Sequence, residues 1–297
     1  MTTTASSPFL GSVRSADVDL FYRRFGYPGA TPLLILHGAN YYDSRDWVHI
    51  ATRLAGDREV CAFDSRGYGQ SGWSPRQDYS LDAHLHDIQT LLDHMGWEQA
   101  VLIGHSRGGS HALRFSHEYP QRVIGLVLVD FSPGQTPGRR AVEHLPMSPW
   151  GPVYESLEQA HAATSRNPDE LASEAGRRRV EAIFGQVDAG WVNVRRDPAY
   201  QSQRPSGRPD WSSVLPPVDL WDALAGLVHR GRPSLVIRAT ESTAYDAAAL
   251  LRLHTDFAPV QLMEVRSGHD IPGTSPAELV GAVRQFLHRP PAETTDL

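Results

Sequence analysis

The sequence predicts an α/β fold, in which helices cover both faces of a mostly parallel sheet. Short apolar runs recur along the chain, and most are separated by stretches with apolar residues three and four positions apart. This alternation is typical of βαβ units, whose parallel strands are buried on both faces. A further observation predicts an insertion, because the alternation stops near residue 134 and resumes only near residue 230.

Seven apolar runs are the expected strands. Most are short and rich in Val, Ile and Leu, as strands covered by helices on both sides must be. In chain order the expected strands are 18–26, 33–38, 59–64, 100–105, 123–130, 234–239 and 260–266. The clearest helical patterns between them are 81–96 (LDAHLHDIQTLLDHMG) and 108–120 (GGSHALRFSHEYP).

The segment 134–230 has a different composition. It is rich in Arg, Pro, Trp and Glu, and it shows helical patterns but no convincing buried strand. Because SLVIRA at 234–239 resumes the sheet pattern, we interpret the segment as an insertion between two strands. We therefore predict a core formed by residues 1–133 and 231–297, with residues 134–230 forming a helical cap, or lid.

Composition excludes several functions. All 28 basic residues are arginine, which excludes lysine Schiff-base chemistry and a P-loop. The formal net charge of −6 gives no electrostatic reason to bind nucleic acid or an anionic membrane. There is no signal-peptide pattern and no run approaching the roughly 20 apolar residues of a membrane span, and the single Cys61 cannot form an intrachain disulfide. We expect a cytoplasmic monomer or homodimer that acts on a small-molecule substrate, with neither nucleic acid nor a membrane as partner.

The stretch 100–115, AVLIGHSRGGSHALRF, contains the strongest motif. An apolar run is followed by Gly104-His105-Ser106-Arg107-Gly108 and then by a helical pattern. This is G-x-S-x-G in the strand–turn–helix setting that makes the serine a nucleophile. Glycines two residues before and after Ser106 remove side chains that would clash in the sharp turn, and the helix N-terminus favours developing negative charge. The alternative is an ordinary turn with an exposed serine.

Two other patterns are weak. GYGQSG at 67–72 matches the dinucleotide fingerprint, but that motif requires a helix to begin there, and no helical pattern starts before about Leu81. In DAHLHD at 82–87, His84 and His86 lie two positions apart and do not share a helix face, so a solvated face is expected. We predict no cofactor and no metal.

Three further segments make the chain resemble the α/β-hydrolase superfamily. They are LLILHGAN at 33–40, FDSRGYGQSG at 63–72 and RSGHDIPGTSPAELVGAVRQFL at 266–287. The likeness runs from about residue 10 to residue 289 and implies that family's fold, a mostly parallel eight-stranded sheet with helices on both faces and a cap insertion. Within the superfamily, VLVDF, VIRATES and SGHD resemble a subset that includes (E)-2-(acetamidomethylene)succinate hydrolase.

The resemblance implies a catalytic triad in the order nucleophile, acid, histidine. His269 is the implied base. Many relatives carry the acid after the strand that corresponds to 234–239, but here Thr243 follows Ser242 where an Asp is usual. Asp130 ends the apolar run VIGLVLVD, at the strand end where α/β sheets place their sites, and a buried carboxylate needs a partner. We favour Asp130 as the acid, with Glu241 as the alternative.

The same resemblance implies an oxyanion hole made of backbone N–H groups. One donor is Arg107, directly after the nucleophile, and the other is Ala39, after His37 and Gly38. An aspartate nucleophile is excluded, because dehalogenases and epoxide hydrolases of this fold carry Asp where Ser106 stands.

Substrate-binding residues are expected beside the oxyanion loop and in the cap. Aromatic side chains could line a pocket, although packing the cap onto the sheet is the commoner role of such residues. An arginine could clamp a carboxylate. The residues considered are His37, Asn40, Tyr41, Trp150, Tyr154, Arg177 and Trp191.

These observations predict a serine hydrolase that cleaves an ester, lactone, amide or related acyl bond of a small organic molecule, such as a carboxylated compound or a secondary metabolite. One alternative is a non-hydrolytic catalyst of the same fold, a cofactor-free dioxygenase, lyase or cyclase, with the His269–Asp130 pair as base. Another is a non-catalytic binding protein, which need not retain all three triad residues.

Overall fold

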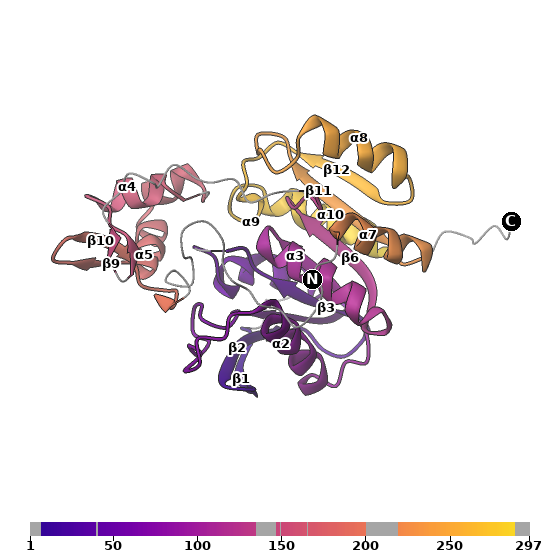
Figure 1. The fold of residues 1–297 in the computed structure, drawn as a ribbon, viewed down its shortest axis with the longest axis horizontal. Helices are drawn as coiled ribbons and strands as arrows, with labels where there is room; N and C mark the ends of the chain where they lie inside the picture. Colours follow the sequence, from indigo (N-terminus) through magenta and orange to yellow (C-terminus); the bar gives the residue numbers. More distant parts are fainter. Residues whose placement is uncertain are drawn as a thin grey trace, which may run out of the picture.

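The computed structural model describes residues 7–39, 41–134, 147–148, 150–164, 166–199 and 219–288. Its centre is an eight-stranded sheet in the order β1-β2-β4-β3-β5-β6-β11-β12 (Figure 1). The strands are β1 (Phe9–Ser15), β2 (Val18–Phe25), β3 (Ala30–Leu36), β4 (Arg58–Phe63), β5 (Ala100–His105), β6 (Val123–Val129), β11 (Ser234–Ala239) and β12 (Gln261–Val265).

The sheet is mostly parallel, as the sequence predicted. β2 pairs in antiparallel fashion with both β1 and β4, whereas β4, β3, β5, β6, β11 and β12 pair in parallel. All seven expected strands are present. The prediction missed β1, whose sequence FLGSVRS lies at the edge of the sheet and is partly exposed, so it lacks the apolar signature of a buried strand.

Helices cover both faces of the sheet, and each face has its own apolar core. Residues of α2 (Leu81–His94), α3 (Arg107–Glu118), α7 (Leu220–His229) and α8 (Ala247–Asp256) contribute to one buried cluster. Residues of α1 (Val48–Leu54) and α10 (Pro276–His288) contribute to the other. The short helices η1 (Ser44–Trp47), η2 (Pro120–Arg122) and α9 (Ile271–Thr274) lie in the connections. Within the described ranges, no helix combines the length and the apolar composition needed to span a bilayer.

Side chains at the helix ends explain where several helices begin. The oxygen atoms of Ser80, Asp219 and Asp246 accept hydrogen bonds from backbone N–H groups in the first turns of α2, α7 and α8. Such caps satisfy amides that have no intrahelical partner. The start of α2 at Leu81 agrees with the sequence, so no helix begins at the G-x-G-x-x-G segment.

The insertion forms a separate small layer beside the sheet domain (Figure 1). It contains β7 (Met147–Ser148), β8 (Gly151–Pro152), α4 (Leu157–Ala162), η3 (Pro168–Ala172), α5 (Glu174–Ile183), β9 (Phe184–Val187) and β10 (Gly190–Asn193). Its helices were expected. The β9–β10 hairpin was not, because its four-residue strands are too short to give a clear alternation pattern.

The predicted boundary of the insertion at residue 230 is wrong by one helix. α7 packs on α3, and its residues Trp221, Leu224 and Leu227 are buried in the core cluster on that face of the sheet. The prediction took β11, the strand after α7, as the point at which the core resumes. In a βαβ unit, however, the helix before a strand also packs on the sheet.

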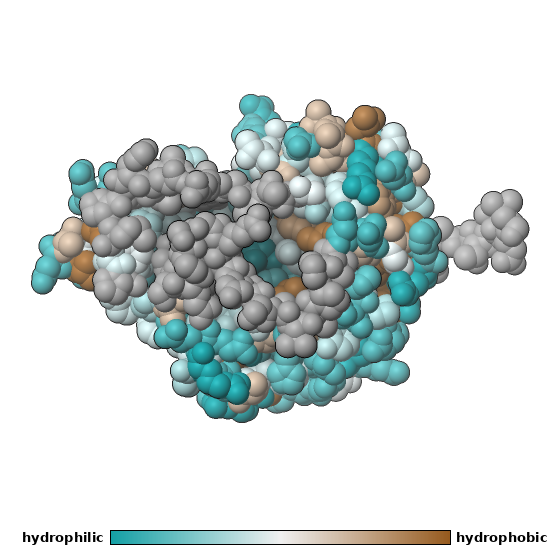
Figure 2. Space-filling model, viewed as in Figure 1, coloured by the Kyte–Doolittle hydropathy of each residue, from teal (hydrophilic) through white to brown (hydrophobic). Residues whose placement is uncertain are grey.

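The described surface carries no single large apolar patch on the face drawn in Figure 2, where hydrophobic residues are scattered among hydrophilic ones. The large hydrophobic side chains that are exposed are Phe9, Leu10, Tyr27, Trp73 and Leu251. Isolated exposed residues of this kind are normal for folded proteins.

Candidate active site

Ser106 lies at a sharp turn between β5 and α3. Its backbone has φ 52° and ψ −119°, a conformation that L-residues other than glycine rarely adopt. Its N–H donates to the carbonyl of Val129 at 3.0 Å, so the ladder between β5 and β6 continues to the turn itself. This strained strand-to-helix turn is the geometry that the G-x-S-x-G motif predicts.

The glycines beside Ser106 permit close contacts between backbones. A Cβ atom on Gly104 would lie 2.4 Å from the carbonyl oxygen of Gly108, and one on Gly108 would lie 2.3 Å from that of Leu36. Both distances are too short for real Cβ contacts. The two glycines therefore let the start of α3 pack directly on the ends of β3 and β5. This agrees with the prediction that they remove side chains that would clash in the turn.

Asp130 follows β6 and is completely buried. It also has a positive φ of 44°, and its N–H donates to the carbonyl of Ile237 at 2.7 Å. Its Oδ1 accepts a hydrogen bond from the N–H of Ala239 at 3.0 Å. The carboxylate is thus held by the backbone of the neighbouring strand β11, with its second oxygen left for another partner.

That partner is His269. Its Nδ1 lies 2.6 Å from Oδ2 of Asp130, and its Nε2 lies 2.9 Å from Oγ of Ser106. The three side chains come from three separate connections, after β5, β6 and β12. The structure therefore brings together the three residues that sequence reasoning selected, in one continuous chain of hydrogen bonds.

Glu241, the alternative acid, does not contact His269 in the structure. Its carboxylate pairs with Arg266 at 3.1 Å, and both side chains are exposed. The geometry favours Asp130 as the partner of the histidine.

His105, the first variable residue of the motif, holds the backbone of His269 in place. Its Nε2–H donates to the backbone carbonyl of His269 at 2.9 Å, and the two rings lie 4.9 Å apart. Burial, with the nearby His269 ring, lowers the pKa of His105 to about 3. His105 is therefore a neutral donor at any ordinary pH. Sequence reasoning missed this role, because the position is variable in the motif.

The loop after β3 holds Ala39, the second predicted oxyanion donor. A Cβ atom on Gly38 would lie 2.8 Å from Nδ1 of His105, and one on Gly108 would lie 2.7 Å from the carbonyl oxygen of His37. The loop that carries Ala39 thus packs against the first turn of α3 and against the turn at Ser106, which we call the elbow. Arg107 is the first residue of that helix, where backbone N–H groups point out of the N-terminal end.

His37, one of the residues expected to bind substrate, holds this loop in place. Its Nε2 accepts from the N–H of Ser65 at 2.9 Å, and its Nδ1–H donates to the carbonyl of Gly38 at 2.6 Å. Burial and the charge of Arg107 lower the pKa of His37 to about 4. Both ring nitrogens are used internally, so the side chain has no donor or acceptor left for a substrate.

The Arg107 side chain lies beside the elbow. Nη1 donates to the hydroxyl of Tyr68 at 2.9 Å, and the guanidinium sits over the Tyr68 ring at 4.3 Å. Near it, the ring of buried His84 lies 4.4 Å from that of half-buried His111, and burial lowers the pKa of each well below its usual value. The prediction that His84 lies on a solvated face is therefore wrong.

Most of the other predicted substrate-binding residues pack within or against the insertion. Tyr41 and Trp191 pack on its apolar cluster, which includes Tyr154, and the Tyr41 hydroxyl lies 3.1 Å from that of Tyr154. Trp150 contacts Trp73 of the core with ring centroids 6.0 Å apart. These contacts match the packing alternative for the aromatic residues.

The two remaining predictions in this group have different outcomes. Arg177 forms an exposed ion pair with Glu158 at 3.3 Å, inside the insertion. Its partner belongs to α4 and not to the Ser106–His269–Asp130 arrangement. Asn40 lies outside the described residues.

Buried ion pairs between the insertion and the core were not predicted. Arg166 and Arg179 of the insertion contact Asp46 of η1 at 3.0 and 3.1 Å. Burial opposes ionisation of Asp46, but the two guanidinium groups outweigh it and hold the pKa of this carboxyl well below its usual range. The pKa of Asp270, next to His269, is shifted in the opposite direction, because burial raises it to about 7.

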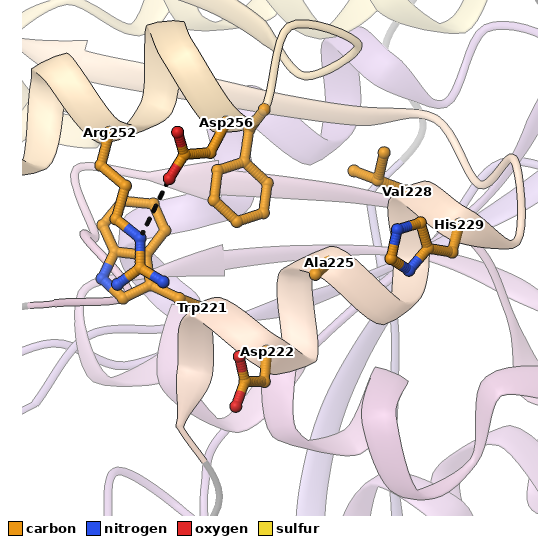
Figure 3. A pocket seen from close by; sticks show the side chains of 8 residues that line it. Trp221, Asp222, Ala225, Val228, His229, Arg252 and Asp256 are labelled. Carbon is orange, nitrogen blue, oxygen red and sulfur yellow. Dashed lines mark ion pairs between the residues drawn. The ribbon is translucent and has the colours of Figure 1, made fainter.

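A surface groove of about 180 Å³ lies between α7 and α8, and Figure 3 shows the side chains that line it. Arg252 lies over the Trp221 ring at 4.8 Å and pairs with Asp256 at 3.6 Å. The lining residues are Trp221, Asp222, Ala225, Val228, His229, Arg252, Asp256 and Phe257. None of them belongs to the Ser106–His269–Asp130 arrangement, so the groove is separate from it.

A metal site is not evident in the part of the chain that the structure describes. No group of three or more His, Cys, Asp or Glu side chains in it is arranged to hold an ion. The chemistry available at Ser106 is that of a hydroxyl, an imidazole and a carboxylate in hydrogen-bond contact.

Comparison with known proteins identifies the family. The model of the α/β hydrolase fold family matches residues 31–271, which is most of the chain. The chain belongs to this family, and its similarity to proteins named as hydrolases indicates that it is an α/β-hydrolase enzyme.

Several relatives span nearly the whole chain. Lipase LipV of Mycobacterium tuberculosis is 28% identical, covering 91% of this chain and 98% of its own. The 2-(acetamidomethylene)succinate hydrolase of Mesorhizobium japonicum is 24% identical, covering 95% and 97%. The crystal structure of an α/β hydrolase from Novosphingobium aromaticivorans superposes with a TM-score of 0.74 at 26% identity, covering 96% of this chain and 99% of its own.

Proposed function

We propose that the protein is a serine hydrolase that cleaves an ester, lactone, amide or related acyl bond of a small organic substrate. The observation that carries the proposal is the unbroken contact from Oγ of Ser106 through the His269 ring to Oδ2 of Asp130. A serine hydroxyl becomes a good nucleophile only when an adjacent base takes its proton. Relatives named as a lipase and as a 2-(acetamidomethylene)succinate hydrolase support hydrolysis as the reaction class.

Each side chain has a defined part in the proposed reaction. Oγ of Ser106 attacks the acyl carbon while its proton moves to Nε2 of His269, and Asp130 stabilises the imidazolium through Nδ1–H. The imidazolium then gives that proton to the leaving group as the acyl bond breaks. A water molecule attacks the acyl-enzyme with the same histidine as base, which releases the acid and restores Ser106.

The proposed oxyanion hole consists of the backbone N–H groups of Arg107 and Ala39. The packing of the Gly38 loop on the first turn of α3 supports this assignment. Backbone donors of this kind stabilise a tetrahedral oxyanion by about 3 kcal/mol each.

Labelling with a fluorophosphonate tests the proposal. We expect the wild-type protein to be labelled at Ser106, and the Ser106→Ala variant to remain folded but unlabelled. A folded wild-type protein that does not react would overturn the proposal. The non-hydrolytic alternative predicts a different pattern, in which Ser106→Ala retains much of the activity whereas His269→Ala loses it.

A further inference from the structure

We propose that Arg166 and Asn167, adjacent residues of the insertion, are positioning residues that hold the loop carrying Ala39 and the loop carrying His269 in their reactive arrangement. The inference rests on the proposed function and adds a role for the insertion in catalysis itself. Neither residue touches the triad directly, so they would act through the two loops that they join.

Arg166 binds the loop that carries Ala39. Its Nη1 donates to the backbone carbonyl of Tyr41 at 3.0 Å, and its Nη2 donates to Oδ1 of Asp46 at 3.0 Å. The Tyr41 N–H in turn donates to the carbonyl of Ala39 at 2.8 Å. The guanidinium is therefore two hydrogen bonds away from the backbone of the proposed oxyanion donor.

Glu170 fixes the orientation of this guanidinium. Its carboxylate accepts from Nε of Arg166 at 2.8 Å and from Nη2 at 2.7 Å, the two-pronged geometry that restrains both groups. The Arg166 side chain is only 6% exposed. Because all three nitrogen atoms of the buried guanidinium are held, the Tyr41 carbonyl that it binds also has one defined position. The ammonium group of a lysine lacks this planar geometry and could not form the same set of hydrogen bonds.

Asn167 binds the loop that carries His269. Its backbone N–H donates at 2.8 Å to Oδ2 of Asp270, the residue that follows the histidine, while Oδ1 of Asp270 accepts from the N–H of Gly273 at the start of α9. The backbone of His269 is therefore restrained on one side by His105 and on the other by the insertion.

The Tyr41 side chain adds a third link between the insertion and the Ala39 loop. It packs against the apolar cluster of the insertion, with its ring 5.4 Å from that of Phe184. The insertion therefore contacts the loop at both the side chain and the backbone carbonyl of Tyr41. Since misplacement by about 1 Å can reduce a rate about a hundredfold, loss of these contacts should slow acylation even when the fold is retained.

Arg166→Lys is the main test, with fluorophosphonate labelling of the whole protein as readout. We expect the maximal labelling rate per folded protein to fall about tenfold or more, while the half-saturating reagent concentration changes by less than about threefold. Folded protein is quantified by circular dichroism. Attachment of the insertion alone would not change the maximal rate of the folded fraction.

Arg179→Lys is the matched control. Arg179 binds the same carboxylate, Asp46, and also Asp43 at 3.2 Å, whereas the Tyr41 carbonyl accepts from Arg166. We expect its labelling rate to stay within about threefold of the wild-type rate. An equal loss in the Arg166→Lys and Arg179→Lys variants would overturn the inference in favour of general anchoring.

A second pair of variants isolates the Asn167 N–H. Asn167 has φ −51°, which proline can adopt, and Pro168 already follows it. Asn167→Ala removes only the side chain that caps η3, whereas Asn167→Pro also removes the N–H that binds Asp270. We expect the proline variant to be labelled about tenfold more slowly than the alanine variant.

The outcomes separate this inference from the proposed function. Normal labelling of wild type together with equal rates in Arg166→Lys and wild type, and in the two Asn167 variants, would overturn the inference and leave the serine hydrolase intact. A folded wild-type protein that is not labelled at Ser106 would overturn both.

Discussion

The hydrogen-bonded triad and the insertion beside it are held in place by different interactions. Ser106 and Asp130 are fixed by backbone hydrogen bonds to Val129, Ile237 and Ala239 within the sheet. The insertion has a small apolar cluster, and its contacts with the sheet domain include the buried ion pairs of Arg166 and Arg179 with Asp46. The backbone of Arg195 and Asp197 also forms hydrogen bonds with the loop after β4. The triad is therefore positioned by the ends of strands that are neighbours in the sheet, whereas the insertion is attached in part by charged side chains that lie far apart in the sequence.

The largest expected effect is on the triad. Asp130→Asn should lower kcat about 10³- to 10⁴-fold, because an amide in this position favours the wrong tautomer of His269 and cannot stabilise its cation. The measurement is steady-state hydrolysis of an acyl substrate, with thermal unfolding to confirm the fold. Glu241→Gln is the control and should stay within about twofold, because the Glu241 carboxylate pairs with Arg266 at the surface. The reverse ranking would make Glu241 the acid.

The next prediction concerns the stability of the elbow. Gly104→Ala should lower the free energy of unfolding by about 3 kcal/mol or more, because the new Cβ meets backbone atoms of Gly108 and Gly109 that move only if α3 leaves the sheet. Urea unfolding measures the loss. Gly281→Ala, in the middle of α10 with open space around it, should instead stabilise the protein by about 0.5–1 kcal/mol. Equal effects at the two sites would mean that the elbow is not tightly packed.

The third prediction concerns the ion pairs that attach the insertion to the sheet domain. Asp46→Asn should lower the free energy of unfolding by about 3 kcal/mol, because it removes the shared partner of two buried guanidinium groups. The loss should be similar at low and high salt, since buried pairs are little screened. Glu174→Gln, which breaks the exposed pair with Arg178, is the control and should leave the urea midpoint almost unchanged.

Acid should lower the free energy of unfolding, because four histidines have lowered pKa values in the folded chain. His37, with a pKa of about 4, and His105, with a pKa of about 3, stay neutral when folded but take up protons near pH 6.5 when unfolded. The pKa values of buried His84 and half-buried His111 are shifted in the same direction. The unfolded chain then binds more protons, so stability falls as pH decreases from about 6.5 to 4. Each histidine contributes a slope of up to about 1.4 kcal/mol per pH unit in this range.

Two buried carboxyls act in the opposite sense over the same pH range. Burial raises the pKa of Asp64 to about 6 and that of Asp270 to about 7, so these groups hold protons in the folded chain and their contribution is lost as pH rises. They offset part of the histidine slope. His84→Asn should reduce the measured slope by about one proton, because the folded chain keeps the buried His84 neutral. An unchanged slope in His84→Asn would contradict the prediction.

The residues predicted from sequence are those whose signal is local. Ser106 sits in a motif of five residues, and Asp130 ends an uninterrupted apolar run, so each position follows from its immediate neighbours. The eight-stranded sheet was predicted for the same reason, together with the family resemblance. Arg166 and Asp46 lie 120 positions apart, and neither belongs to a motif, so only the folded chain reveals that they pair.

Arg177 marks the limit of charge-based prediction and gives the smallest expected effect. A carboxylate clamp was one interpretation of the arginine run at 177–179, but successive residues on a helix point in different directions. Only Arg179 of this run turns towards the core, whereas Arg177 pairs with Glu158 in solvent. Arg177→Ala should therefore leave kcat/KM within about twofold and Tm within about 1 °C of wild type. A large rise in KM for carboxylated substrates alone would restore Arg177 as a binding residue and would extend the role of the insertion from positioning to recognition.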